Sequence, residues 1–173
     1  MKTRVIGVAA MLAAVLATGC ASVGGEPAAH AQLQPTKGNT AAGRVTFTQR
    51  DGGVDLVATV TGLTPGPHGF HVHDKGDCSA PDAASAGGHF NPAGHLHGHP
   101  SVGPRHAGDL PMLEADAAGN ATLKAFVPGL TTAAGPSALA GRAVVVHAAA
   151  DDFKSQPAGN SGARVACGVL AAR

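Results

Sequence analysis

The sequence predicts an all-β domain, an antiparallel sandwich or barrel, on three observations. Short segments alternate apolar and polar residues with a period of two, and Gly- and Pro-rich turns separate them. The part beyond residue 37 has no convincing helical pattern, because Gly135-Pro136 interrupts its Ala-rich stretch at 131–140. Two long regions, 74–110 and 148–163, lack a strand pattern. Long loops in a compact domain are usually functional or disordered, and we predict that these two are functional.

The strand pattern recurs along the chain in segments 45–48, 54–60, 70–73, 123–127 and 144–147. The turn Asp51-Gly52-Gly53 lies between the first two segments and predicts a hairpin. In the third segment Phe70 and Val72 alternate with His71 and His73. Because side chains alternate across a strand, both histidines are expected on one face and both apolar residues on the other. This strand can therefore serve a metal and the core together.

The first residues predict a secretory signal at 1–19. Lys2 and Arg4 precede an apolar run at 5–17, which is too short for a membrane-spanning helix. The small residues before Cys20 are similar to a bacterial lipobox, so we expect Cys20 to carry lipid. The alternative is ordinary cleavage of a secreted protein. With a lipid anchor the protein would be exported and membrane-bound, facing the periplasm or the cell exterior.

We expect residues 20–37 to be the lipidated cysteine and a flexible tether, and 38–173 to be one domain. The tether is rich in Gly, Ala, Pro and Gln. The net charge is +1, and without Lys2 and Arg4 it becomes slightly negative. The chain has no basic run, no Trp and no Tyr. A nucleic acid is therefore excluded as a partner, because neither phosphate binding nor base stacking is provided for.

Six histidines and one aspartate form an array that can hold two metal ions. They are His71, His73, His89, His97, His106, Asp109 and His147. Neutral imidazole binds both copper and zinc, and a carboxylate beside three imidazoles suits a closed zinc site. A His-rich surface loop is the alternative interpretation, but it does not account for histidines at such distant positions.

Cysteines Cys78 and Cys167 remain as a pair if Cys20 is lipidated. In an oxidising export compartment such a pair is most simply a disulfide. Cysteine ligation of a metal is the rival interpretation, although the histidines already complete two sets of ligands.

Several segments together resemble the copper,zinc superoxide dismutase family, in its bacterial exported lipoprotein type. The segments are, in chain order, GFHVHDKGDC, SAGGHFNP, RHAGDLP, GRAVVVHAAADD and GARVACGVL. The likeness extends from about Gly43 to the end of the chain. It implies a Greek-key β-sandwich or flattened barrel of about eight strands, with two long functional loops.

The resemblance implies how the ligands divide between the metals. Copper would be held by His71, His73, His89 and His147. Zinc would be held by His89, His97, His106 and Asp109, so that His89 bridges the two ions. Spacing within the family selects His97 over its neighbours, and His95 and His99 are expected to be solvated.

Further roles also follow from the resemblance. Asp151 matches an aspartate that links a copper ligand to a zinc ligand, and His68 matches a structural histidine. Cys78 and Cys167 match the family disulfide, which would tie the first long loop to a strand near Arg164. Arg164 matches an active-site arginine, and Lys154, in the second long loop, could add to the positive field that Arg164 provides.

The activity that the resemblance implies is dismutation of superoxide to dioxygen and hydrogen peroxide. Copper redox cycling would drive the reaction and zinc would be structural, as a defence against extracytoplasmic superoxide. Arg164 would attract the anionic substrate and His89 would return a proton, so these two residues are the expected catalytic pair. A copper storage or delivery module on the same fold is the alternative. The sequence leaves the oligomeric state open, and a homodimer is compatible with it.

Overall fold

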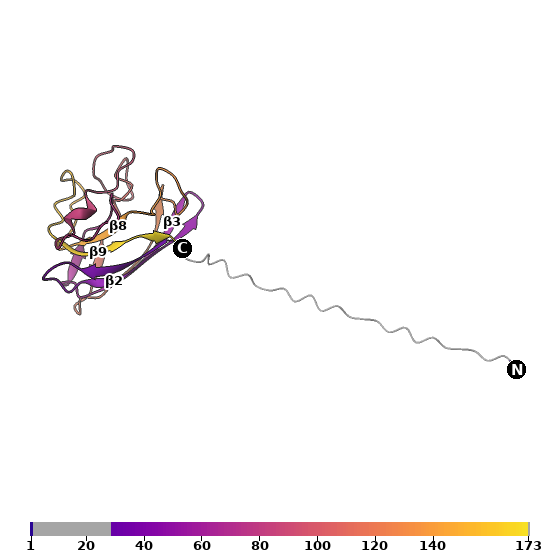
Figure 1. The fold of residues 1–173 in the computed structure, drawn as a ribbon, viewed down its shortest axis with the longest axis horizontal. Coiled ribbons are helices and arrows are strands. Elements are labelled where there is room, and N and C mark those ends of the chain that lie inside the picture. The colour runs from indigo at the N-terminus through magenta and orange to yellow at the C-terminus, as the bar shows by residue number, and fades with distance from the viewer. Residues whose placement is uncertain (2–28, 173) are drawn as a thin grey trace.

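The computed structural model describes Met1 and residues 29–172. They form a large antiparallel sheet curled into a half-barrel and a separate two-stranded sheet (Figure 1). Its strands are β1 (Ala29–Pro35), β2 (Ala42–Arg50), β3 (Gly53–Thr61), β4 (Gly66–His68), β5 (Phe70–His73), β6 (Leu113–Ala115), β7 (Ala121–Pro128), β8 (Ala143–His147), β9 (Arg164–Val169) and β10 (Ala171–Ala172). A single 3-10 turn, η1 (Ala84–Ala86), is the only helical element in the described part of the chain. The all-β prediction is confirmed.

The strand order in the large sheet is β5-β8-β9-β1-β2-β3-β7, with β10 beside β1 and a separate pair β4-β6. Hairpin β2–β3 was predicted from its turn and is confirmed, with Arg50 opposite Gly53. The chain passes from β3 to β5 and from β7 to β8 between opposite sides of the sheet. Such crossing connections between antiparallel strands are typical of Greek-key folds. Among the described residues, none belongs to a helix with the length and hydropathy of a membrane span.

The prediction of a tether at 20–37 is wrong from Ala29 onward. Residues 29–35 form β1, which lies inside the sheet and pairs with β2, β9 and β10. Ala29, Ala31 and Leu33 alternate into the core and are almost completely buried. Because two of these three side chains are only methyl groups, the alternation was too weak to identify in the sequence. Apart from Met1, the predicted signal at 1–19 and the predicted lipid site Cys20 lie outside the residues that the structure describes.

The hydrophobic core lies in the curl of the sheet. Phe47, Phe70 and Phe90 are fully buried there, together with aliphatic side chains from β1, β2, β3, β7 and β8. Burial of apolar side chains from distant strands is the main force that holds the curl together. The core thus fixes β5 and β8, the two strands that carry three of the predicted metal ligands.

The first long loop, which joins β5 to β6, returns along the free edge of β5. The Val72 amide donates a hydrogen bond of 2.9 Å to the Gly108 carbonyl, and the Phe90 amide donates one of 2.8 Å to the Val72 carbonyl. A disulfide between Cys78 and Cys167 fastens the same loop to β9, as predicted. The first long loop is therefore fixed beside β5, one of the two strands that bear the histidines.

Candidate metal centre

Four histidines bring one ring nitrogen each to a common point, with all four atoms within 4.8 Å of one another. His71 and His73 come from β5, and His147 is the last residue of β8. His89 comes from the returning loop and lies directly opposite His73 in an isolated antiparallel bridge. The predicted set of copper ligands is therefore assembled as one group.

Hydrogen bonds orient three of these rings through the nitrogen that points away from the group. The His71 Nε2–H donates to the Asp151 carboxylate at 2.7 Å. The His73 Nδ1–H donates to the Gly87 carbonyl at 2.9 Å, and the His147 Nδ1–H donates to the Gly162 carbonyl at 3.2 Å. Since a neutral imidazole has one N–H, the other nitrogen of each ring carries a lone pair. These partners select the tautomer that a metal ligand requires.

The nitrogens that face one another have no hydrogen-bond partner. They are His71 Nδ1, His73 Nε2, His89 Nε2 and His147 Nε2, and all are buried. Buried polar atoms are nearly always paired, so four unpaired lone pairs that converge on one point fit a metal ion as their common partner. Four imidazole nitrogens suit Cu(II).

A second group is formed by His89, His97, His106 and Asp109. The Nδ1 atoms of His89 and His97 lie 2.9 and 3.0 Å from Asp109 Oδ1. The Nδ1 atom of His106 lies 3.4 Å from the same oxygen and 3.4 Å from His89 Nδ1. Ligands at the corners of a tetrahedral zinc site are separated by roughly 3.3 Å. These four atoms therefore match a closed zinc site of three nitrogens and one oxygen.

The Asp109 carboxylate is oriented by the backbone around it. Its Oδ2 atom accepts hydrogen bonds from the amides of His106 at 3.0 Å and Gly98 at 3.1 Å, which leaves Oδ1 to face the histidines. Burial raises the pKa of Asp109, but hydrogen bonds from His89 and Gly98 and the nearby imidazoles lower it below its usual value. The group is thus a carboxylate at neutral pH, as a zinc ligand must be.

Asp151 joins the two groups of ligands, as the resemblance to the family implied. One carboxylate oxygen accepts from His71 Nε2 at 2.7 Å and the other from His97 Nε2 at 2.9 Å. The Phe153 amide also donates to this carboxylate at 2.7 Å. A buried carboxylate that accepts from ligand imidazoles fixes their orientation and raises their basicity.

Gly159 leaves the space that this link needs. Its φ is +63°, and a Cβ there would overlap Asp151 Oδ1 and lie 2.6 Å from His97 Nε2. We expect Gly159→Ala to displace the Asp151 carboxylate and to weaken zinc binding roughly 10–100-fold, the usual effect of losing such a partner. Competition with a chromophoric zinc chelator measures this change.

Gly162→Ala provides the matched control for that variant. Gly162 lies in the same loop with a φ of +77°, so alanine brings the same backbone strain, but its Cβ would make only ordinary contacts, with Ala149 at 3.5 Å and Ala148 at 3.8 Å. The control should keep its zinc affinity. Equal zinc loss in both variants would mean that backbone strain, and not displacement of Asp151, is responsible.

Burial keeps His71, His73 and His147 neutral. It lowers the pKa of His73 to about 2 and that of His147 to about 4, and the positive charge of Arg164 contributes to both decreases. The pKa of His71 is also well below its ordinary value, first because of burial and then because of His89 and His147. Neutral imidazole is the form that binds metal.

The metal-free protein is expected to lose stability as the pH falls. The unfolded chain takes up protons on histidine near pH 6.5, whereas folded His73 and His147 take them up only at about 2 and 4. Stability is therefore fully present above pH 6.5 and decreases on acidification, by about 2 kcal/mol for each of the two at pH 5. Urea denaturation of the metal-free protein between pH 7.5 and 5 tests this. A His73→Gln variant should lose only the share of that one histidine, about 2 kcal/mol at pH 5, because His71 and His147 keep theirs. A flat profile in the unmodified protein would contradict the prediction.

Arg164 stands beside the first group and is held at both ends of its guanidinium. Its Nη1 donates to the Ala83 carbonyl at 2.6 Å and its Nη2 to the Gly87 carbonyl at 2.7 Å. The Gly87 carbonyl also accepts from His73, so one backbone oxygen connects the arginine with a metal ligand. Ala83 adopts the left-handed conformation, with a φ of 59°, which is unusual for a residue with a Cβ. Such backbone strain is found where a functional group must be positioned.

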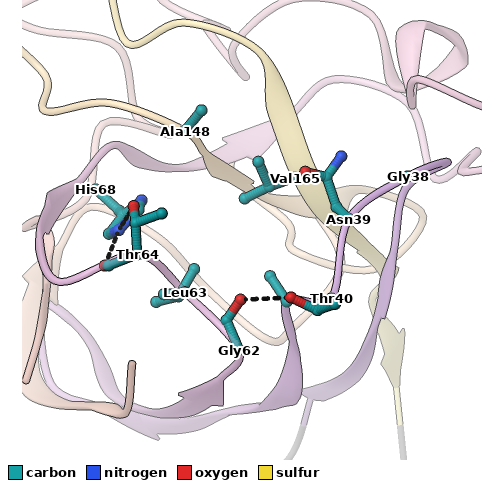
Figure 2. A pocket seen from close by; sticks show the side chains of 10 residues that line it. Gly38, Asn39, Thr40, Gly62, Leu63, Thr64, His68, Ala148 and Val165 are labelled. Atoms are coloured by element: carbon teal, nitrogen blue, oxygen red, sulfur yellow. Dashed lines mark hydrogen bonds between the residues drawn. The ribbon is translucent and has the colours of Figure 1, made fainter. Parts of the chain in front are cut away.

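His68 belongs to neither metal group, in agreement with its expected structural role. Its Nδ1 lies 2.7 Å from the His147 carbonyl oxygen and its Nε2 lies 2.8 Å from the Thr64 carbonyl oxygen. Figure 2 shows this ring beside Thr64, on the wall of a cavity of about 210 Å³ that Val165 also lines. Because both ring nitrogens face backbone oxygens, the ring braces the end of β8 and is not a ligand.

Three further residues considered in the sequence analysis, His95, His99 and Lys154, lie outside the two groups of metal ligands. His95 and His99 are exposed and take part in neither, as expected for solvated side chains. Lys154 is exposed in the second loop, with its amide bound to Asp152. Sequence reasoning did not identify Gly159, Ala83 or the Gly87 carbonyl, because backbone atoms and a missing Cβ carry no chemical pattern in a sequence.

Fold and site together define a β-sheet metalloprotein with adjoining copper and zinc sites that share one histidine. The family model for copper/zinc superoxide dismutase (SODC) matches residues 41–170. The chain therefore belongs to the copper/zinc superoxide dismutase family.

Individual relatives agree with this assignment. The chain is 47% identical over 135 residues to the superoxide dismutase [Cu-Zn] of Caulobacter vibrioides, covering 75% of this chain and 78% of that one. It is 37% identical over 180 residues to the corresponding protein of Deinococcus radiodurans, covering 98% of both chains. Among solved structures, the clock protein EA4 has a TM-score of 0.77 at 42% identity, covering 85% of this chain and 96% of its own. The SOD-like protein from Bacillus subtilis has a TM-score of 0.74 at 38% identity, covering 82% of this chain and 97% of its own.

Proposed function

We propose that this protein dismutates superoxide: one anion is oxidised to dioxygen, and another takes two protons and is reduced to hydrogen peroxide. The observation that carries the proposal is the convergence of four unpartnered histidine nitrogens beside a positioned arginine. When bound, copper supplies the one-electron chemistry and zinc supplies charge and geometry. The residues of the chain do the rest: they bind, orient and deliver protons.

Arg164 is the residue that attracts and orients the anion. Two of its N–H groups are used by the Ala83 and Gly87 carbonyls, and the remaining donors are free to bind a small anion. Burial lowers the pKa of Arg164 and Asp82 raises it, but a guanidinium remains charged at neutral pH. The first group thus has a fixed positive charge next to it.

His89 is the residue that carries a proton. Its Nε2 faces the other three histidines without a partner, while its Nδ1 belongs to the zinc group. A proton held at Nε2 lies where a reduced oxygen species would form, and imidazole can donate it there as a general acid. Its side chain is only 2% exposed, so the transfer is shielded from bulk water.

Superoxide decay after pulse radiolysis tests the proposal directly, using the protein loaded with copper and zinc. The expected result is rapid decay that slows as ionic strength rises, because a charged site attracts an anion less strongly in salt. Decay at the buffer background, with both metals bound, would overturn the proposal and favour copper storage or delivery.

We further infer that the protein is exported and anchored by lipid at Cys20, and so acts against extracytoplasmic superoxide. The Cys78–Cys167 disulfide supports an oxidising compartment, and the residues before Cys20 are similar to a lipobox. Incorporation of a fatty-acid analogue, compared between the full chain and Cys20→Ser, tests the anchor. Equal labelling of both chains would exclude lipid at Cys20.

A further inference from the structure

We propose that Lys37 is a second cationic residue of the substrate entrance, in the same cavity as Arg164; this rests on the proposed dismutase function. The cavity has a volume of about 400 Å³, and its lining includes Thr36, Lys37, Asp82, Gly162 and Arg164. Gly162 also lines a second cavity, of about 280 Å³, which reaches His147. The cavity beside Lys37 therefore adjoins the cavity that reaches the first metal group, with Gly162 in the wall of both.

The turn after β1 holds Lys37 against the structures that position Arg164. The Thr36 hydroxyl donates to the Arg164 carbonyl at 2.8 Å, and the Thr36 amide donates to the Val165 carbonyl at 3.1 Å. The Lys37 amide donates to the Pro81 carbonyl at 2.8 Å, two residues before the Ala83 carbonyl that accepts from Arg164. The backbone of Lys37 is thus fixed between β9 and the loop that binds the guanidinium.

The net charge of the residues that line this cavity depends on Lys37. Arg164 and Lys37 are positive and Asp82 is negative. The Asp82 carboxylate accepts from the Ala84 amide at 2.9 Å, which keeps it at the rim, and its charge acts on Arg164. Without Lys37 the charges of the lining residues Arg164 and Asp82 sum to zero, so this cavity would contribute no net positive charge at long range. With Lys37 the entrance is positive, which raises the encounter rate of an anion.

Lys37, and not Lys154, lines the cavity that contains Arg164. Lys154 is exposed in the second loop and does not line the Arg164 cavity. In the cavity that reaches His147, the lining contains no lysine or arginine. Among the residues that line these two cavities, the positive charge that accompanies Arg164 is that of Lys37, which the sequence placed in the tether.

Charge variants at low and high ionic strength test the proposal, using the protein loaded with copper and zinc. At about 10 mM salt a unit charge near the entrance changes the rate roughly two-fold. We expect kcat/KM to fall about two-fold in Lys37→Gln and about four-fold in Lys37→Glu, and to rise about two-fold in Asp82→Asn. Lys37→Arg and Lys154→Gln should match the unmodified protein, and all variants should converge at about 1 M salt.

Azide affinity, measured by absorption titration of the same proteins, gives a second readout that needs no turnover. It should weaken in Lys37→Glu and remain unchanged in Lys154→Gln at low salt. Unchanged kcat/KM and azide affinity in Lys37→Glu, or a loss that persists at high salt, would overturn the role of Lys37. If the unmodified protein does not dismutate superoxide while azide affinity still depends on Lys37, the proposed function fails and the anion entrance stands.

Discussion

Replacing His147 with alanine is expected to reduce superoxide dismutation at least about 100-fold while zinc stays bound. His147 Nε2 is one of the four unpartnered nitrogens of the copper group, and the residue takes no part in the zinc group. Loss of even an outer hydrogen-bond partner of a metal ligand costs roughly 10–100-fold, so loss of a direct ligand should cost more. Pulse radiolysis measures the rate, and elemental analysis measures both metals.

This variant also distinguishes an enzyme from a copper store. In an enzyme, turnover disappears although the remaining histidines keep part of the copper. His95→Ala is the matched control, because His95 is an exposed histidine outside both groups and should leave rate and metal content unchanged. Full turnover in His147→Ala would contradict the dismutase mechanism and the role of His147 in it.

Removing the disulfide is expected to cause the largest loss of stability. Cys78 and Cys167 are 89 residues apart in sequence, and in the chain-entropy model a loop of this size contributes about 4–5 kcal/mol. Replacing both residues with alanine should lower the free energy of unfolding by that amount and Tm by roughly 10–20 °C. Activity should fall as well, because the loop that the bond fastens contains the carbonyls that hold Arg164.

Chemical reduction provides the control for the disulfide variant. A reductant should lower the Tm of the unmodified protein to that of the variant, and it should not affect the variant. If the double variant has the same Tm as the unmodified protein, the first long loop is already ordered by its metal ligands and its pairing with β5. Copper content, measured in parallel, separates a displaced Arg164 from a lost metal.

Strands β2, β3, β5 and β7 were predictable because apolar and polar residues alternate along each of them. Strand β8 was predictable as a compact β-branched run, and it is buried throughout. In β5 all four residues are buried, since the core covers one face and the loops cover the other. Strands β4 and β6 were missed because three residues are too few to establish a period. The short side chains of β1 hid its alternation, although it pairs inside the sheet.

The sequence by itself determined the chemistry of the two metal groups. Histidine and aspartate at these positions are metal ligands by their side-chain chemistry, and their spacing matched one family through ordered motifs. The disulfide was also predictable, since two cysteines allow one pairing once Cys20 is set aside.

Only the tertiary structure decided how these groups are held. The carbonyls of Gly87 and Gly162 set the tautomers of His73 and His147, and Asp151 reaches both groups only because Gly159 has no Cβ. These contacts join residues that are far apart in sequence, and many involve backbone atoms that every residue shares. A sequence records which ligands are present, whereas their protonation, orientation and neighbouring charge depend on which distant segments the sheet brings together.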